Sequence, residues 1–288
     1  MKMTQVRKTL LTTLAIAFIT CGVIYAGIII HGYRQGQREY SELADRYTSY
    51  SIRPADDDLP VQNTEQDSTL KAEQVYRTEI NRDAVGDEKT DNVLPADAPE
   101  MLNVDFDSLR KENKDVIGWI NIPAIDISYP VLQADDNEYY LHRDLHGNYL
   151  FAGSIFVDSS CSSTFADYNT ILYGHNMRDG SMFAGLRKFQ DEKTLQKCRY
   201  FWICTPREKL LYEIYSIHTA SVGSDTYRVR FNNYEEYASW LQGMRSLSIP
   251  EMEVETEGVE KIVTLSTCTE NTSIRKVVQG KMVWMEKT

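Results

Sequence analysis

A cysteine and an arginine stand seven positions apart near the end of the chain, in the stretch TLSTCTENTSIR. Cys268 ends a strand-like apolar run, a polar turn follows, and Arg275 opens a second strand-like run. A thiol at a strand end can act as a nucleophile when a neighbour stabilises its thiolate or takes its proton. Arg stays protonated and suits an anion that forms on a substrate carbonyl oxygen. The pair is therefore a candidate nucleophile and a candidate anion-stabilising group at one rim of a sheet.

A third candidate is His175, in the stretch ILYGHNM, which also ends a strand-like run. A histidine there can move protons near neutral pH. Of the five histidines, only His175 shares the strand-end placement of Cys268. Simpler interpretations exist for each residue: a surface-loop histidine for His175, a small buried hydrophobe for Cys268, and an edge-strand charge for Arg275.

Lys276 competes with Arg275 for the anion-stabilising role. Side chains alternate between the two faces of a strand, so these neighbours point to opposite faces and at most one of them can serve the site. Two adjacent antiparallel strands joined by the intervening turn would bring Cys268 and Arg275 to the same rim.

Runs rich in Val, Ile, Tyr and Thr are predicted to form the strands that position these residues. They follow a helix at Phe106–Lys114 and cover Val116–Ile122 and residues 125–133, 153–160, 169–176, 197–205, 209–222, 261–268 and 275–284. Helical segments are expected at residues 181–190 and 233–247. Short strands with few helices predict a mainly β domain, an antiparallel barrel or sandwich.

The N-terminus predicts a membrane anchor. Residues 10–30 contain no charged side chain and follow the basic Lys2, Arg7 and Lys8. About 20 apolar residues cross a bilayer as a helix, and the basic flank predicts a cytoplasmic tail at residues 1–9 with the rest of the chain outside. A cleaved signal peptide is the alternative, but its apolar core is usually about 7–15 residues long. We expect a single-pass protein of the cell membrane.

Residues 31–100 are predicted to be an extracytoplasmic linker, helical and polar at first and then acidic and punctuated by Pro. The acidic part has too few large apolar residues to offset the entropy of ordering. The composition changes near Met101, which predicts a catalytic domain at residues 101–288. A net charge of −11 argues against nucleic acid as a partner. The five cysteines contain no CxxC pair, which disfavours a zinc ribbon.

The signature TLSTC followed by Arg, together with YGH upstream, resembles the sortases, membrane-anchored cysteine transpeptidases of Gram-positive bacteria. The stretches IGWINIPAIDISYPVLQADDNEYYLHRDL, GSIFVD and NTILYGHNM point to the class B branch. The resemblance covers about residues 101–288. It implies a closed eight-stranded β-barrel with N-terminal and inserted helices, preceded by one transmembrane helix. It also implies a catalytic trio of Cys268 as nucleophile, His175 as general acid and base, and Arg275 as stabiliser of the oxyanion or substrate.

The same resemblance implies that Asn137, Leu141 and Ser266 line a groove for the substrate peptide. The plainer interpretations are a helix-start cap for Asn137, a core contact for Leu141 and a strand hydroxyl for Ser266. The implied reaction cleaves a C-terminal sorting motif of secreted proteins through a thioacyl-enzyme. An amine of a peptidoglycan precursor or cross-bridge then receives the acyl group, and no metal or organic cofactor is required.

Three alternatives remain open. A pilin-polymerising sortase would pass the acyl group to a protein subunit. A papain-type peptidase is disfavoured, because its cysteine lies at a helix start near the mature N-terminus, with an Asn or Asp to orient the histidine. A non-catalytic membrane-anchored binding domain would have a buried Cys268 that tolerates substitution.

Overall fold

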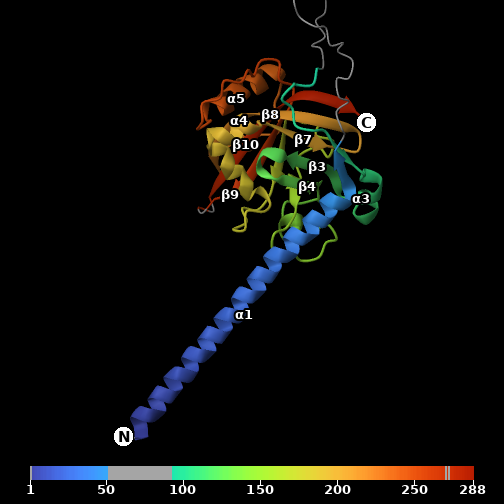
Figure 1. Cartoon of the computed structure of the whole chain (residues 1–288). Coiled ribbons are helices and arrows are strands. Elements are labelled where there is room, and N and C mark those ends of the chain that lie inside the picture. Colours follow the sequence, from blue (N-terminus) through green and yellow to red (C-terminus); the bar gives the residue numbers. More distant parts are fainter. Residues whose placement is uncertain (1, 51–92, 270, 272) are drawn as a thin grey trace, which may run out of the picture.

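The computed structural model describes residues 2–50, 93–269, 271 and 273–288. Eight strands close into a barrel in the order β10-β8-β7-β3-β4-β5-β6-β9, which confirms the predicted barrel (Figure 1). They are β3 (Val116–Ile122), β4 (Ile127–Leu132), β5 (Ile155–Val157), β6 (Asn169–Tyr173), β7 (Tyr200–Cys204), β8 (Glu208–Ser221), β9 (Ile262–Cys268) and β10 (Ile274–Lys287). Each of these strands lies within or overlaps a run that the sequence predicted.

Two of the strand pairs are parallel, β4 with β5 and β6 with β9. The expectation of an antiparallel barrel is therefore wrong for these pairs and right for the other six. A parallel neighbour needs a long connection that returns the chain to the same end of the barrel. Residues 133–154 and 174–261 make these returns, and the second return includes four helical elements and two strands of the barrel.

The inserted helical segments also form. Residues 183–190 adopt a 3-10 helix, η3 (Phe183–Gln190), and α5 (Tyr234–Ser246) is an α-helix capped by Asn233, whose side chain accepts from the backbone N of Glu236 at 2.9 Å. The remaining helices are α3 (Phe106–Glu112), α4 (Glu192–Lys197), η1 (Pro123–Ile125), η2 (Tyr139–His142) and η4 (Asp225–Tyr227). Helix α4 was not predicted, and only its last residue, Lys197, falls within the strand run predicted at residues 197–205.

The N-terminal helix α1 (Lys2–Tyr47) projects from the barrel as one long rod (Figure 1). Its stretch from Leu10 onward is long and apolar enough to cross a membrane, and residues 10–30 of it are exposed in the structure. The predicted span at residues 10–30 therefore lies inside a longer continuous helix.

Beyond the apolar stretch, α1 packs on the barrel through one stripe of residues: Tyr33, Gly36, Tyr40, Leu43 and Tyr47. Spacings of three and four place these side chains on one helix face. The hydroxyl of Tyr40 also donates to a barrel-loop carbonyl at 2.6 Å. The charged residues between the tyrosines make this stripe look polar in the sequence.

Strand β1 (Thr48–Tyr50) extends α1 and pairs antiparallel with β2 (Leu102–Val104), the strand that leads into α3. Packing against the barrel thus begins well before residue 101, within the segment predicted as linker. The acidic part of that predicted linker, residues 51–92, lies outside the described residues.

Candidate active site

Cys268 and Arg275 lie directly opposite each other in the antiparallel ladder of β9 and β10. Residues that pair in this way project from the same face of a sheet, with their Cβ atoms about 5 Å apart. The expectation that the turn returns both side chains to one rim is therefore correct. Lys276 faces the other way, where its Nζ donates to Oε1 of Gln190 on η3 at 2.9 Å.

The parallel pairing of β6 and β9 brings His175 to the same edge. Tyr173 pairs with Ser266, and His175 and Cys268 each lie two residues further along parallel strands. Their positions therefore match across the sheet, at the carboxyl ends of both strands. An imidazole, a thiol and a guanidinium come from three neighbouring strand ends in the order β6, β9, β10.

A pocket of about 390 Å³ opens at this edge, and we call it the rim pocket. All six residues that the sequence singled out line it: Asn137, Leu141, His175, Ser266, Cys268 and Arg275. Its wall also includes aromatic and small residues that the sequence did not single out, among them Tyr173 and Tyr227.

The imidazole of His175 is held by its neighbours. Its Nε2 donates to the carbonyl oxygen of Leu141 at 2.8 Å, because a carbonyl can only accept, and this leaves Nδ1 as the nitrogen that exchanges a proton. The ring stacks on His142 with centroids 5.1 Å apart. Burial lowers the pKa of His175; the hydrogen bond to Leu141 opposes that shift and the nearby His142 adds to it.

Gly174 lets the chain pass tightly from β6 to His175. A Cβ at this position would lie 2.4 Å from Cδ1 of Ile155 and 2.8 Å from the ring of Phe183. No real Cβ tolerates such distances, so only glycine fits without a shift of the neighbours. The backbone N of Gly174 also donates to the carbonyl oxygen of Ser266 at 3.2 Å, which extends the β6–β9 ladder toward the pocket.

Cys268 is half-buried, and its backbone is fixed by Asn176, whose Nδ2 donates to the Cys268 carbonyl oxygen at 2.9 Å. This bond ties the segment after His175 to the end of β9. By contrast, Cys161 and Cys204 are buried, and burial raises the pKa of each thiol to about 12. The partial exposure of Cys268 differs from the buried Cys268 expected of a non-catalytic binding domain.

Tyr227, at the end of η4, is a pocket residue that sequence reasoning missed. Its hydroxyl and the Ser266 hydroxyl share a hydrogen bond of 2.9 Å. Burial raises the pKa of Tyr227 most; the Ser266 bond and the Arg275 charge lower it, and Cys268 raises it. The phenol therefore lies within electrostatic reach of both the thiol and the guanidinium. Tyr227 lies 41 residues before Cys268 and 48 before Arg275, in a turn with no motif, so only the fold reveals its place in the pocket.

The groove residues have structural partners of their own. The Asn137 side chain donates to Oδ2 of Asp158 at 2.9 Å and accepts from the backbone N of Ser159 at 2.8 Å. The cap of the following turn is instead Asp136, which accepts from the backbone N of Glu138 at 2.9 Å. Asn137 is thus fixed in the pocket wall with one amide hydrogen still available.

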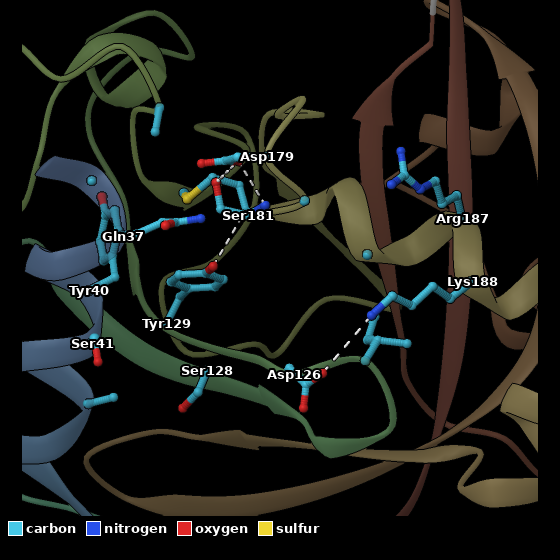
Figure 2. A pocket seen from close by; sticks show the side chains of 17 residues that line it. Gln37, Tyr40, Ser41, Asp126, Ser128, Tyr129, Asp179, Ser181, Arg187 and Lys188 are labelled. Carbon is cyan, nitrogen blue, oxygen red and sulfur yellow. Dashed lines mark hydrogen bonds and ion pairs between the residues drawn. The ribbon is translucent and has the colours of Figure 1, made fainter. Parts of the chain in front are cut away.

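A larger cavity of about 580 Å³, the helix cavity, lies between α1, β4 and η3. Figure 2 shows Gln37 and Tyr40 of α1 on one side and Lys188 of η3 on the other, with Lys188 paired to Asp126 at 4.0 Å. None of the residues lining it is a cysteine or a histidine. Over the part of the chain that the structure describes, no group of three or more His, Cys, Asp or Glu side chains is arranged to hold a metal ion.

Comparisons with known proteins agree with this geometry. The model of the sortase domain family matches residues 120–283. Sortase B of Listeria monocytogenes is 33% identical over 216 residues, covering 73% of this chain and 88% of its own, and sortase B of Staphylococcus aureus is 30% identical over 187 residues, covering 64% and 77%.

Solved structures show the same likeness. A sortase B from B. anthracis superposes with a TM-score of 0.58 at 35% identity, covering 63% of this chain and 85% of that one. A Staphylococcus aureus sortase B–substrate complex gives a TM-score of 0.58 at 31% identity, covering 62% and 83%.

Proposed function

The chain belongs to the sortase family as a class B cysteine transpeptidase, and from this premise we propose that Cys268, His175 and Arg275 carry its reaction. The observation that supports the proposal most is the alignment of these three side chains on three neighbouring strand ends around one pocket. The comparisons give no support to a papain-type peptidase or to a non-catalytic binding domain.

In the first half-reaction, the Cys268 thiolate attacks the carbonyl carbon of the scissile peptide bond, and a C–S bond forms. The carbonyl oxygen becomes an oxyanion, to which Arg275 donates hydrogen bonds. The C–N bond then breaks, and the leaving nitrogen takes a proton from the His175 imidazolium. A thioester between the substrate and Cys268 remains.

In the second half-reaction, an amine attacks the thioester carbonyl. Neutral His175 takes the proton of this amine, a new amide bond forms, and the C–S bond breaks to return the thiolate. The same nitrogen therefore serves both halves, and Nδ1 is free to do so because Nε2 is held by Leu141. A lowered pKa of His175 makes its protonated form scarcer and hence a stronger acid in the first half.

For the substrate, we propose a C-terminal sorting motif of a secreted protein, as the solved complex of a related sortase B with its substrate suggests. Asn137, Leu141 and Ser266 would contact its backbone and side chains from the pocket wall. The acceptor we propose is an amine of a peptidoglycan precursor or cross-bridge.

We also place the enzyme at the membrane. Residues 10–30 of α1 would span the bilayer with the N-terminus in the cytoplasm, and the barrel would lie outside. Substrate and acceptor at the same surface would then meet the enzyme at a raised effective concentration.

The test incubates the detergent-solubilised full chain with a library of quenched peptides, with and without an added amine. We expect cleavage of a restricted set of sequences and a product joined to the amine. Product made only with water would contradict the transpeptidase half, and transfer only to the amine of a protein subunit would replace the cell wall as acceptor.

A further inference from the structure

Two aromatic side chains stand exposed on the loop between η2 and β5. Tyr149 is 74% exposed and Phe151 is 49% exposed. Both rings stack with His142, at centroid distances of 6.2 and 6.4 Å, and His142 stacks in turn on His175. These exposed aromatics therefore adjoin the wall of the rim pocket.

The same loop is seated on α1. Phe151 packs edge-on against Tyr33, with ring centroids 5.9 Å apart. A Cβ built on Gly36 would lie 3.4 Å from Cβ of Ala152, so helix and loop touch there as well. One turn later the Tyr40 hydroxyl donates to the carbonyl oxygen of Gly153 at 2.6 Å. The loop thus follows α1 upward from Tyr33.

The height of these contacts above a bilayer follows from helix geometry. A helix rises about 1.5 Å per residue, so residues 10–30 span about 30 Å, the thickness of the hydrocarbon core. Tyr33 then lies about 5 Å beyond the core and Gly36 about 9 Å beyond it, where each headgroup layer is about 5–8 Å deep. The loop that touches both residues begins at headgroup level.

The distance between the barrel and the bilayer is fixed by helix α1. Helix α1 is continuous through Tyr47, and Tyr40, Leu43 and Tyr47 are buried against the rest of the protein. Figure 1 shows the barrel lying beside the upper part of α1, with the apolar part of the helix projecting below it. Position along α1 therefore sets the height of the barrel.

The chemistry of the surface fits the headgroup layer. Aromatic rings, tyrosine especially, gather where hydrocarbon meets headgroups, because one end of the side chain is apolar and the other is polar. On α1, Arg34 is exposed next to Tyr33, about 6 Å beyond the core, where its long side chain can reach lipid phosphates.

We propose that Tyr33, Tyr149 and Phe151 form a membrane-docking patch that binds the headgroup layer of the bilayer into which α1 inserts. The patch holds the rim pocket beside the outer surface of that bilayer, at a fixed height and orientation. This inference rests on the proposed span at residues 10–30 and adds to it a second, separate contact between barrel and membrane.

The experiment places single tryptophans in the full chain, reconstituted into phosphatidylcholine vesicles with or without bromine high on the acyl chains. Bromine quenches tryptophan only nearby. Tyr149→Trp tests the patch, and Tyr25→Trp tests the span. Ile249→Trp is the control, since Ile249 is similarly exposed at 63% but lies just after α5, away from α1 (Figure 1). The wild-type chain, with its four tryptophans, supplies the background.

We expect the added emission of Tyr149→Trp and Tyr25→Trp to be lost in brominated vesicles and that of Ile249→Trp to persist. If Tyr25→Trp is quenched while Tyr149→Trp behaves like Ile249→Trp, the docking patch is wrong and the span stands. If Tyr25→Trp is not quenched, the span is wrong, and the patch fails with it.

Discussion

The rim pocket and the helix cavity differ more in their side chains than in their size. The helix cavity is the larger, about 580 Å³ against about 390 Å³, yet hydroxyls, carboxylates and two cations line it, without a thiol or an imidazole. The rim pocket gathers a thiol, an imidazole and a guanidinium because three strands end there in register. Strand register, and not volume, decides where this protein can carry out acyl transfer.

The assignment of activity to the rim pocket is tested most strongly by substitution of its nucleophile. Cys268→Ala removes the sulfur that forms the thioester, so peptide cleavage should fall by on the order of 10⁴-fold or more. Cys198→Ala is the matched control, because Cys198 is also a half-buried free cysteine but lies at the end of α4. A fluorescence assay with a quenched peptide gives both rates, and equal rates in the two variants would remove Cys268 from the mechanism.

Substitution of His175 should have the next largest effect. His175→Gln keeps a polar side chain but cannot carry a proton to the leaving amine, which should cost about 10²–10⁴-fold in kcat. His146→Gln is the control, since His146 is exposed and lies 3.7 Å from Glu112, outside the rim pocket. Full activity of His175→Gln would show that another group moves the proton.

Substitution of the two neighbouring cations on β10 tests which face of the strand stabilises the oxyanion. Arg275→Gln removes the charge opposite Cys268 and should lower kcat/KM by about 10²–10³-fold. Lys276→Gln removes a charge from the opposite face and should leave cleavage close to that of the wild type. Steady-state kinetics of the pair decide between them, and a larger loss in Lys276→Gln would reverse the assignment.

A smaller loss should follow from Gly174→Ala. The new methyl group would overlap Ile155 and Phe183, and relief of that overlap should cost about 1–3 kcal/mol in the free energy of unfolding. It should also displace His175 and lower kcat by up to about 10²-fold. Gly243→Ala in α5 is the control, because no atom lies within 4 Å of its added Cβ. Urea unfolding and kcat, measured on both variants, should diverge; matched values would mean that Gly174 does not position His175.

His218 should matter for stability and hardly for catalysis. It is 2% exposed in β8, where Ser216 and Thr226 face its ring, and burial lowers its pKa from 6.5 to about 4. A lowered pKa favours the neutral form in the fold, so this contribution is present above pH 6.5 and is lost as the pH falls toward 4.

Between pH 6.5 and pH 4, protonation of His218 should lower the free energy of unfolding by about 3 kcal/mol. In His218→Asn, the free energy of unfolding should fall less between pH 7 and pH 4.5 than in the wild type, as urea titrations at both pH values would show. An unchanged pH dependence would assign the acid sensitivity to other groups.

Much of the barrel could be predicted because each strand is itself rich in residues that favour β structure. Runs such as Val116–Ile122 are rich in residues that favour strands, and the turn after Cys268 specifies its own antiparallel return. The parallel contact of β6 with β9 could not be predicted from the residues alone, since nothing within residues 169–176 specifies a partner about ninety positions away. Only the family resemblance placed His175 with Cys268 in advance.

The α1 stripe and Tyr227 were missed for related reasons. Tyr33, Tyr40 and Tyr47 are separated by charged residues, so the segment has a polar average although one of its faces is buried. Tyr227 belongs to a short turn whose position depends on the strands around it. The burial of the α1 stripe and the position of Tyr227 both depend on tertiary packing, which local sequence patterns do not specify.

The central claim is that a thioester forms on Cys268 in the rim pocket. The most direct measurement reacts the full chain with a cleavable peptide in the absence of amine, quenches it in acid, and maps the acylated fragment by mass spectrometry. The account predicts an acyl group on the fragment containing Cys268, which disappears when an amine is added. An acyl group on Cys161, Cys198 or Cys204, or cleavage with no covalent intermediate on any cysteine, would contradict it.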